Sequence, residues 1–295
     1  MAAKPKAAAR CFEIPSPFEE GGERVLLLDA PDDPEELRRQ LLNDRYPRPF
    51  VIDDGERRWL HFDRRLVQSA MRLDAPNALD VRYTQKMMSF LLFQPKPQRI
   101  VLIGLGGGSL VKFCRSRLPA THLTVVEIDP DVIALRDAFW LPPDGPNLRT
   151  VQADGAAYLE EAEKGIDVLL LDAFDRRGYA PSLACPEFLR QAKVKLAGSG
   201  VLVANLAGNA ESRAGLVGMA MDVFERQVVV FPVREDDSHV LLAFKDERFE
   251  PDWRRLHNRA KELRAKYGLD FPVFAEKIEG AMKEGAAQRA AERGG

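Results

Sequence analysis

A glycine-rich turn between an apolar run and a helical pattern restricts the fold of this chain more than any other feature. The run Arg99-Ile100-Val101-Leu102-Ile103 leads directly into Gly104-Leu105-Gly106-Gly107-Gly108. The run is typical of a buried parallel strand, and the glycines let the backbone approach a ligand closely. We therefore predict the strand, turn and helix that begin a nucleotide-binding βαβ unit, with Gly104, Gly106, Gly107 and Gly108 at the cofactor.

An acidic residue after the next apolar run favours a ligand that carries a ribose. Glu127 follows Val125-Val126, about 20 residues beyond the glycines. Folds of this kind place a carboxylate there to accept hydrogen bonds from both ribose hydroxyls. The glycines alone are also compatible with a tight βα connection that binds nothing. No Gly-Lys-Ser/Thr sequence follows them, so a phosphate-binding P-loop is not expected.

Strand and helix patterns alternate beyond residue 98, which predicts a parallel sheet covered by helices on both faces. Only Pro232 to Ser238 separate the last two strands, too few residues for a crossover helix, so the final strand should run antiparallel to its neighbour. Seven strands that end in such a hairpin are typical of the Rossmann-like fold of AdoMet-dependent transferases. We predict them at residues 99–103, 122–126, 148–152, 167–172, 200–205, 227–232 and 239–244.

The chain outside this sheet divides into three further parts. Residues 1–22, rich in Ala, Pro, Lys and Gly, are predicted to form a disordered tail. Residues 23–79 contain a short strand, a helix that begins at Pro34 and short antiparallel strands, which together predict a small N-terminal β-rich domain. Residues 80–248 are the Rossmann-like domain, beginning with an apolar helix over 80–93, and 249–295 are predicted to form a C-terminal helical arm.

Composition excludes several classes of function. A formal net charge of −2 over 295 residues gives no electrostatic footprint for nucleic acid or an anionic membrane, and no apolar run is long enough to cross a bilayer. The cysteines, Cys11, Cys114 and Cys185, have none of the paired spacings of a metal site or disulfide framework. We expect a cytoplasmic protein without a metal, in which the four histidines are structural or lie on the surface.

Three more acidic residues follow predicted strands, at the sheet edge where ligands bind in open parallel sheets. Asp154 could accept a hydrogen bond from the adenine amine or cap the helix that begins at Gly155, and one carboxylate can do both. Asp172 follows a buried strand, where it faces the ligand or anchors a loop. Asp175 lies in the loop beyond, where it is simply exposed or is the second carboxylate of a site for a cation.

The order of these motifs resembles the spermidine synthase (polyamine aminopropyltransferase) family over roughly residues 45–245. The motifs are Leu66-Val67-Gln68-Ser69, Tyr83, the glycine turn, Val126-Glu127-Ile128-Asp129, Asp154-Gly155 and Asp172-Ala173-Phe174-Asp175. The resemblance implies that the chain binds decarboxylated AdoMet through Gln68, Glu127 and Asp154, and it adds Tyr83, Ile128 and Gly155 to the cofactor-binding residues. It further implies that Asp172 orients and deprotonates the attacking amine, and that Asp175 binds a polyamine ammonium.

The chain departs from the family pattern at three places. The family has an acid in the glycine turn, and Gly107 stands there. Thr84-Gln85 replaces a His-Glu pair, and Val233 to His239 replaces an aromatic pocket. The missing acid would have held the amino group of the donor and repelled a carboxylate. Ordinary AdoMet is therefore an alternative donor, with its carboxylate at the backbone N–H groups of Gly106 to Ser109.

Three functions follow in order of preference. The first is transfer of an aminopropyl group from decarboxylated AdoMet to an amine, with Asp172 and Asp175 as the catalytic residues. The second is an AdoMet-dependent methyltransferase on the same fold, and the third is a noncatalytic nucleoside-binding homologue. The family resemblance and the β-rich N-terminal region also predict a homodimer.

Overall fold

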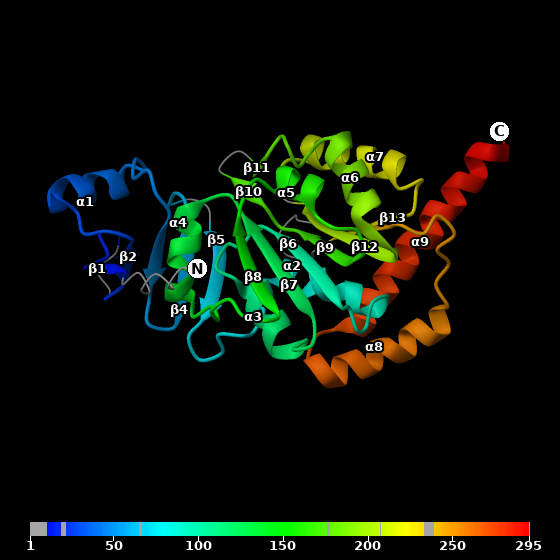
Figure 1. Cartoon of the computed structure of the whole chain (residues 1–295), viewed down its shortest axis with the longest axis horizontal. Coiled ribbons are helices and arrows are strands. Elements are labelled where there is room, and N and C mark those ends of the chain that lie inside the picture. The colour runs from blue at the N-terminus through cyan, green and yellow to red at the C-terminus, as the bar shows by residue number, and fades with distance from the viewer. Residues whose placement is uncertain are drawn as a thin grey trace, which may run out of the picture.

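The computed structural model of the chain describes residues 11–18, 22–64, 67–175, 178–206, 208–232 and 239–294. Two β-sheets lie beside each other, a small N-terminal one and a large one surrounded by helices (Figure 1). Both contribute to the candidate site, so their packing matters for function.

The small sheet is antiparallel, with its strands in chain order. It contains β1 (Phe12–Pro15), β2 (Arg24–Leu27), β3 (Phe50–Asp53), β4 (Arg57–His61) and β5 (Val67–Arg72), and α1 (Pro34–Leu42) joins β2 to β3. The prediction that residues 1–22 are disordered is wrong for β1, which pairs with β2 along its full length. This strand is too short to stand out as a pattern, and the β2 edge supplies the hydrogen bonds that order it.

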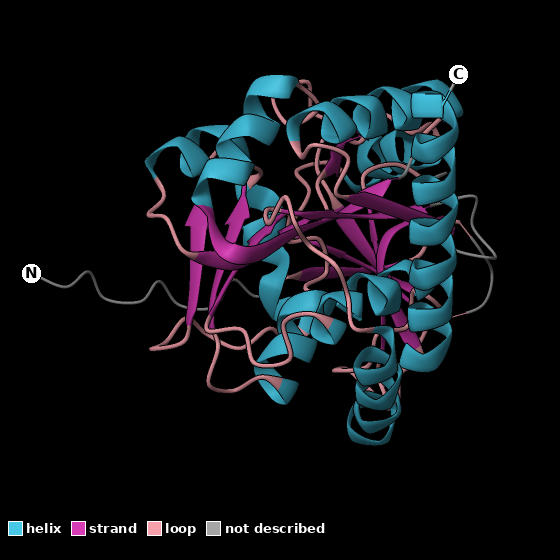
Figure 2. Cartoon of the chain, turned by 90° about the vertical axis from the view of Figure 1, so that its right-hand side faces the viewer, coloured by secondary structure: helices cyan, strands magenta, loops and turns pink. Residues whose placement is uncertain are grey.

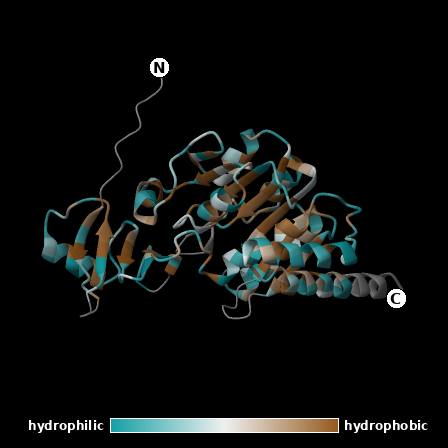
Figure 3. Cartoon of the chain, turned by 90° about the horizontal axis from the view of Figure 1, so that it is seen from below, coloured by the Kyte–Doolittle hydropathy of each residue, from teal (hydrophilic) through white to brown (hydrophobic). Residues whose placement is uncertain are grey.

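The two faces of the small sheet bury different partners. Val25 and Leu27 of β2 point to one face, which packs with Phe50 against Leu37 and Leu41 of α1. The alternate residue of β2, with side chains from the next strands, joins the main core of the molecule: Leu26, Val51, Leu60 and Met71. Because side chains alternate across a strand, one sheet serves both cores. Figure 3 shows the apolar strands of both sheets among more polar helices.

The large sheet has the seven predicted strands. They are β6 (Arg99–Ile103), β7 (His122–Glu127), β8 (Leu148–Gln152), β9 (Ile166–Leu171), β12 (Leu196–Leu206), β13 (Val228–Pro232) and β14 (His239–Phe244), in the spatial order β13-β14-β12-β9-β6-β7-β8. β14 is antiparallel to both of its neighbours, which confirms the predicted terminal hairpin. β12 begins at Leu196, earlier than expected, with an irregular register before Val201.

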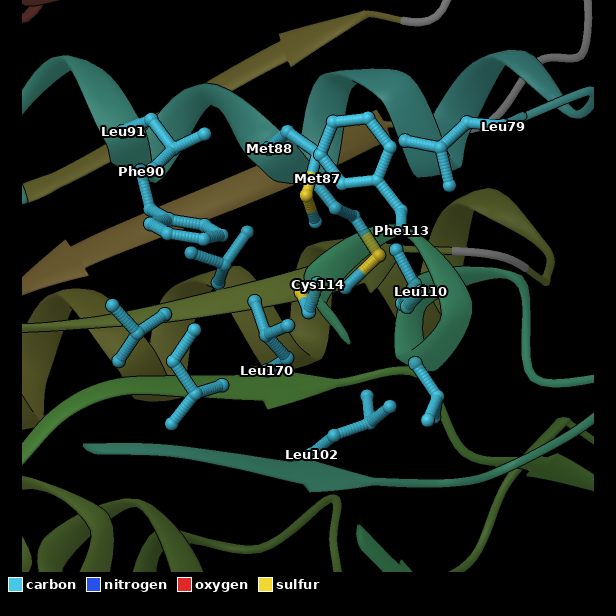
Figure 4. Close-up of a cluster of buried hydrophobic side chains, with 14 of the residues drawn as sticks. Leu79, Met87, Met88, Phe90, Leu91, Leu102, Leu110, Phe113, Cys114 and Leu170 are labelled. Atoms are coloured by element: carbon cyan, nitrogen blue, oxygen red, sulfur yellow. The ribbon is translucent and has the colours of Figure 1, made fainter. Parts of the chain in front are cut away.

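Helices cover both faces of this sheet, as Figure 2 shows. One layer contains α2 (Arg82–Met87), the 3-10 helix η1 (Met88–Leu92), α3 (Ser109–Arg117), α8 (Trp253–Tyr267) and α9 (Phe271–Gly294), and the other contains α5 (Gly155–Glu161), α6 (Pro186–Lys195) and α7 (Ala210–Val223). Side chains alternate between the two layers: Leu102 and Leu170 face the first, as Figure 4 shows, and Val101 and Leu169 face the second. The helix expected over 80–93 is therefore split, with α2 and η1 packed over the sheet.

The C-terminal helices are part of this first layer. Leu256 and Leu263 of α8 and Phe271, Phe274 and Ile278 of α9 are buried in the main core. The predicted arm is thus a layer of the fold, because its apolar stripe is long enough to cover η1 and the sheet beneath it. Within the described ranges, no helix is long and apolar enough to span a membrane.

Chain order places the cleft of the large sheet beside β6. The chain passes from β6 to β7 on one side and later returns to β9 on the other. Such a reversal opens a crevice at the carboxyl ends of the central strands. The glycine turn follows β6 and therefore lies at this crevice. Two short elements, α4 (Pro130–Ala134) and the 3-10 helix η2 (Leu135–Phe139), follow β7 beside it.

Candidate active site

A cleft at the carboxyl ends of the central strands contains most of the predicted site. The predicted residues that line it are Gln68, Tyr83, Gly104, Gly106, Glu127, Ile128, Asp154, Gly155 and Asp172. The small sheet supplies one wall through Leu60, Phe62, Gln68 and Ser69. The site is thus built from both sheets, which the glycine and acid motifs alone do not reveal.

The glycine turn is shaped by close packing as well as by the cleft. Gly104 has φ +99°, and a Cβ atom on it would lie 2.1 Å from the carbonyl oxygen of Asp172. Gly106, with φ +50°, lines the cleft. The structure places Gly107 and Gly108 beside the cleft and outside its lining. Gly107 packs against Ser69 and Phe139, and Gly108, the N-cap of α3, packs against Leu141. Part of the glycine pattern therefore reflects packing.

Glu127 holds the turn in place from the end of β7. Its Oε2 accepts a hydrogen bond from the Leu105 N–H at 2.9 Å, and its Oε1 accepts one from the Asp129 N–H at 2.9 Å. Burial raises the pKa of this carboxyl, and the backbone hydrogen bonds oppose that rise. Each carboxylate oxygen can accept more than one hydrogen bond, so both retain capacity for hydroxyl groups in the cleft. Ile128, next to it, is 62% exposed.

Asp154 caps α5, which is one of the two alternatives that the sequence predicted for this residue. Its Oδ1 accepts from the N–H groups of Ala156 at 2.8 Å and Ala157 at 3.1 Å. Its Oδ2 accepts from the Ser182 hydroxyl at 3.2 Å. Ser182 carries no signal in the sequence, because it reaches Asp154 only through the loop that follows β9.

Asp172 is buried at the end of β9 and bonded by two side chains. Its Oδ2 accepts a hydrogen bond from the Tyr83 hydroxyl at 3.2 Å, and its Oδ1 accepts one from the Asn205 amide at 3.0 Å. Burial raises the pKa of Asp172 to about 6, although both hydrogen bonds act to lower it. Asn205 was missed by sequence reasoning. The available signal was a polar residue at the end of the apolar run Val201 to Ala204.

The remaining predicted positions differ in how far the structure describes them. Asp175 ends β10 (Phe174–Asp175), which pairs with β11 (Gly178–Tyr179), but its side chain lies outside the described part of the chain, as do residues 233–238. Thr84 lines the cleft, whereas Gln85 donates to the Leu79 carbonyl oxygen at 2.7 Å and does not line it. No three His, Cys, Asp or Glu side chains of the described ranges converge as a metal site requires.

The arrangement suits proton transfer beside an apolar cleft. A carboxyl group whose pKa is about 6 is largely ionised at neutral pH and is a stronger base than an exposed aspartate. Tyr83 and Asn205 fix its orientation from α2 and β12. Glu127 lies at the end of β7, which is separated from β9 by β6, and the apolar Ile103 and Val126 line the cleft with it. The cleft can therefore hold a polar group and an apolar body close to one base.

Comparison with known proteins identifies the family. A sequence profile described as the spermine/spermidine synthase domain matches residues 80–213. The polyamine aminopropyltransferase of Chromobacterium violaceum is 33% identical over 233 residues, which cover 79% of this chain and 89% of that protein. This identity extends over nearly the whole relative, beyond the part that the profile matches.

Solved structures with the same fold come from two groups of enzymes. A probable spermidine synthase from Corynebacterium glutamicum has a TM-score of 0.62 at 19% identity, covering 78% of this chain and 91% of that one. Human methyltransferase-like protein 13 in complex with SAH has a TM-score of 0.59 at 20% identity, covering 64% of this chain and 93% of that one. At these identities the likeness shows the fold alone, whereas the sequence match above shows that the chain belongs to the polyamine aminopropyltransferase family.

Proposed function

We propose that this protein transfers an aminopropyl group from decarboxylated AdoMet to an amine. The observation that carries the proposal is the buried carboxylate of Asp172, held by Tyr83 and Asn205 at the cleft. The name of the relative from Chromobacterium violaceum supports the same reaction. The chain's own residues supply a base, a place for a ribose and an apolar wall.

In the proposed reaction, the nitrogen of the amine attacks the methylene carbon beside the positively charged sulfur of the donor. A C–N bond forms while the C–S bond breaks, and its electron pair remains on sulfur, which leaves neutral methylthioadenosine. The proton lost from the amine nitrogen passes to Asp172. The protein mainly aligns the two reactants and accepts one proton, for which a buried carboxylate with a raised pKa is suited.

The donor would lie across the ends of the central strands. Glu127 would accept hydrogen bonds from the ribose hydroxyls, and Ile128, Asp154 and Gly155 would surround the adenine. Gln68 would hold the part derived from methionine. The apolar lining and the acid at the end of β7 fit such a nucleoside.

Several finer expectations belong to the same proposal. Asp175 would bind an ammonium group of a polyamine acceptor, and the enzyme would act without a metal, as a homodimer in the cytoplasm. Light scattering of the purified protein tests the dimer.

For Asp175, replacement by asparagine should raise KM for a diamine more than KM for a monoamine.

The direct test is release of methylthioadenosine by the purified protein. With decarboxylated AdoMet and a panel of aliphatic diamines and triamines, chromatography should detect methylthioadenosine in proportion to the new amine product. Omission of the amine should stop the release. Release that does not depend on any amine, or no release with any of them, would rule out the proposal.

The activity should depend on pH through Asp172. Because the carboxylate is the active form, turnover is expected to fall as the pH decreases through about 6. Tyr83→Phe removes a hydrogen bond that lowers the pKa of Asp172, so the acid limb of the kcat profile should move to higher pH. Tyr158→Phe, on α5, is the matched control and should not move it. An acid limb at the same pH in Tyr83→Phe would contradict Asp172 as the titrating base.

A second candidate, methyl transfer from ordinary AdoMet, is favoured by one observation in the glycine turn. At Gly107, where the family has an acid, a Cβ atom would lie 2.8 Å from the Ser69 hydroxyl and 3.0 Å from the Phe139 ring. The space that an acidic side chain would need is thus filled. Calorimetry with both donors separates the candidates: tighter binding of decarboxylated AdoMet supports aminopropyl transfer, and tighter binding of AdoMet supports methyl transfer.

A further inference from the structure

A salt bridge joins the N-terminal unit, which is the small sheet together with α1 and its connections, to α4. This helix closely follows Glu127, the residue that we predict to bind the ribose. Arg48 lies between α1 and β3, and its guanidinium donates to both carboxylate oxygens of Asp131, from Nε to Oδ2 at 2.7 Å and from Nη2 to Oδ1 at 2.7 Å. Its third nitrogen contacts Asp29. Two parallel bonds fix the relative orientation of both groups, which a single contact does not.

Hydrogen bonds continue from this salt bridge to the glycine turn. Asp131 is the second residue of α4, and its N–H donates to Asp129 Oδ1 at 2.8 Å. The Asp129 N–H donates to Glu127 Oε1 at 2.9 Å, and Glu127 Oε2 accepts from the Leu105 N–H at 2.9 Å. Arg48 is thus connected to both the carboxylate in the cleft and the turn after β6.

A second arginine of the N-terminal unit contacts the far end of residues 128–140, the segment that contains α4 and η2. Arg58 of β4 donates to the Ala138 carbonyl oxygen, and its guanidinium lies 5.3 Å from the centre of the Trp140 ring. The fully buried Asp53 fixes Arg58 through a 2.8 Å hydrogen bond. From α3, the Lys112 ammonium donates to the Phe139 carbonyl oxygen at 2.9 Å.

Residues 128–140 form one side of the cleft. Ile128 and Val132 line it, and Phe139 packs behind Gly107. Figure 1 shows α4 beside the strands of the small sheet. α4 has only five residues, too short to be stable by itself in water, so its geometry depends on contacts such as that of Arg48.

We infer that Arg48 is a positioning residue for the donor nucleoside, acting through Asp131 on α4 and Glu127, and that the small sheet is in this way coupled to donor binding. The inference rests on the proposed function in one respect, that a nucleoside binds at Glu127. Without Arg48, α4 and Ile128 would have to be ordered when the nucleoside binds, and that ordering lowers affinity. The reacting groups at Asp172 lie at a different strand end and should be unaffected at saturation.

The test compares Arg48→Gln with Arg39→Gln, which removes another arginine of the N-terminal unit. Arg39 is paired with Glu36 on the surface of α1. Calorimetry with methylthioadenosine should show about tenfold weaker binding for Arg48→Gln, and steady-state kinetics should show a higher KM for the donor with kcat within about twofold. Arg39→Gln should match the unmodified protein. Arg48→Lys, which keeps the charge but loses the paired geometry, should recover only part of the affinity.

A double-mutant cycle identifies the route. If Arg48 acts through Asp131, the loss in Arg48→Gln/Asp131→Asn should be well below the product of the two single losses. Equal affinity of Arg48→Gln and the unmodified protein, or a lowered kcat with unchanged KM, would overturn the inference. If the unmodified protein itself bound no nucleoside, the proposed function would fail instead. Should Arg48→Gln not fold, Arg48→Lys and Asp131→Asn provide the same comparison.

Discussion

Asp172→Asn is expected to lower kcat about a thousandfold, because the amide accepts no proton and a general base contributes roughly 10²- to 10⁴-fold. The affinity for methylthioadenosine should remain within about twofold, since the proposed nucleoside contacts lie at other strand ends. Rapid-quench measurement of a single turnover, with calorimetry alongside, gives both values. Asp167→Asn is the matched control on the same strand. The Asp167 carboxylate accepts hydrogen bonds from the N–H groups of Gln98 and Arg99 at the far end of β9.

Folding should not explain the loss in Asp172→Asn. The folded pKa of Asp172, about 6, lies above the ordinary value of about 3.9. The folded state therefore binds more protons than the unfolded state between these values, and the ionised group lowers stability as the pH rises through that window. At pH 7 the asparagine variant should unfold at the same or a higher temperature. Full turnover in this variant, or a marked drop in its unfolding temperature, would contradict the assigned role.

Gly104→Ala is expected to destabilise the protein by about 3 kcal/mol or more and to abolish detectable nucleoside binding. The added Cβ would lie 2.1 Å from the Asp172 carbonyl oxygen, and the residue would keep a φ of +99° that favours glycine. Relief requires β6 and β9 to separate where the Asp172 N–H donates to the Ile103 carbonyl oxygen at 2.9 Å. This separation would move the turn and the carboxyl group of Asp172 together.

Urea unfolding of Gly104→Ala and Gly145→Ala checks this expectation. A Cβ atom on Gly145 meets nothing within 4 Å, so that variant should have nearly the stability and nucleoside affinity of the unmodified protein. Equal stability of the two variants would contradict this expectation. It would show that the turn can shift at little cost in free energy, and that the close approach of Asp172 does not require glycine at position 104.

Periodicity predicts the parts of this fold that depend on local sequence. The buried run at residues 99–103 and the short connection after Pro232 were sufficient to predict a parallel strand and an antiparallel end. Two acids at strand ends, Glu127 as the last residue of β7 and Asp172 directly after β9, could be placed at one edge of the sheet from the sequence, since the carboxyl ends of parallel strands meet there.

Contacts between distant segments account for what sequence patterns did not show. β1 is ordered by the edge of β2, and Asn205 reaches Asp172 only because β12 pairs with β9. Arg48 is separated by 83 positions from its partner Asp131. Each of these residues looks ordinary in its local sequence, and only the three-dimensional packing of the chain gives it a role.

Mass spectrometry of the acceptor after incubation with both donors tests the central claim most directly. With decarboxylated AdoMet and ordinary AdoMet present at equal concentration, we predict that the amine gains the mass of an aminopropyl group and that Asp172→Asn prevents the gain. An acceptor that instead gains only a methyl group, or that remains unchanged with the unmodified protein, would contradict the account.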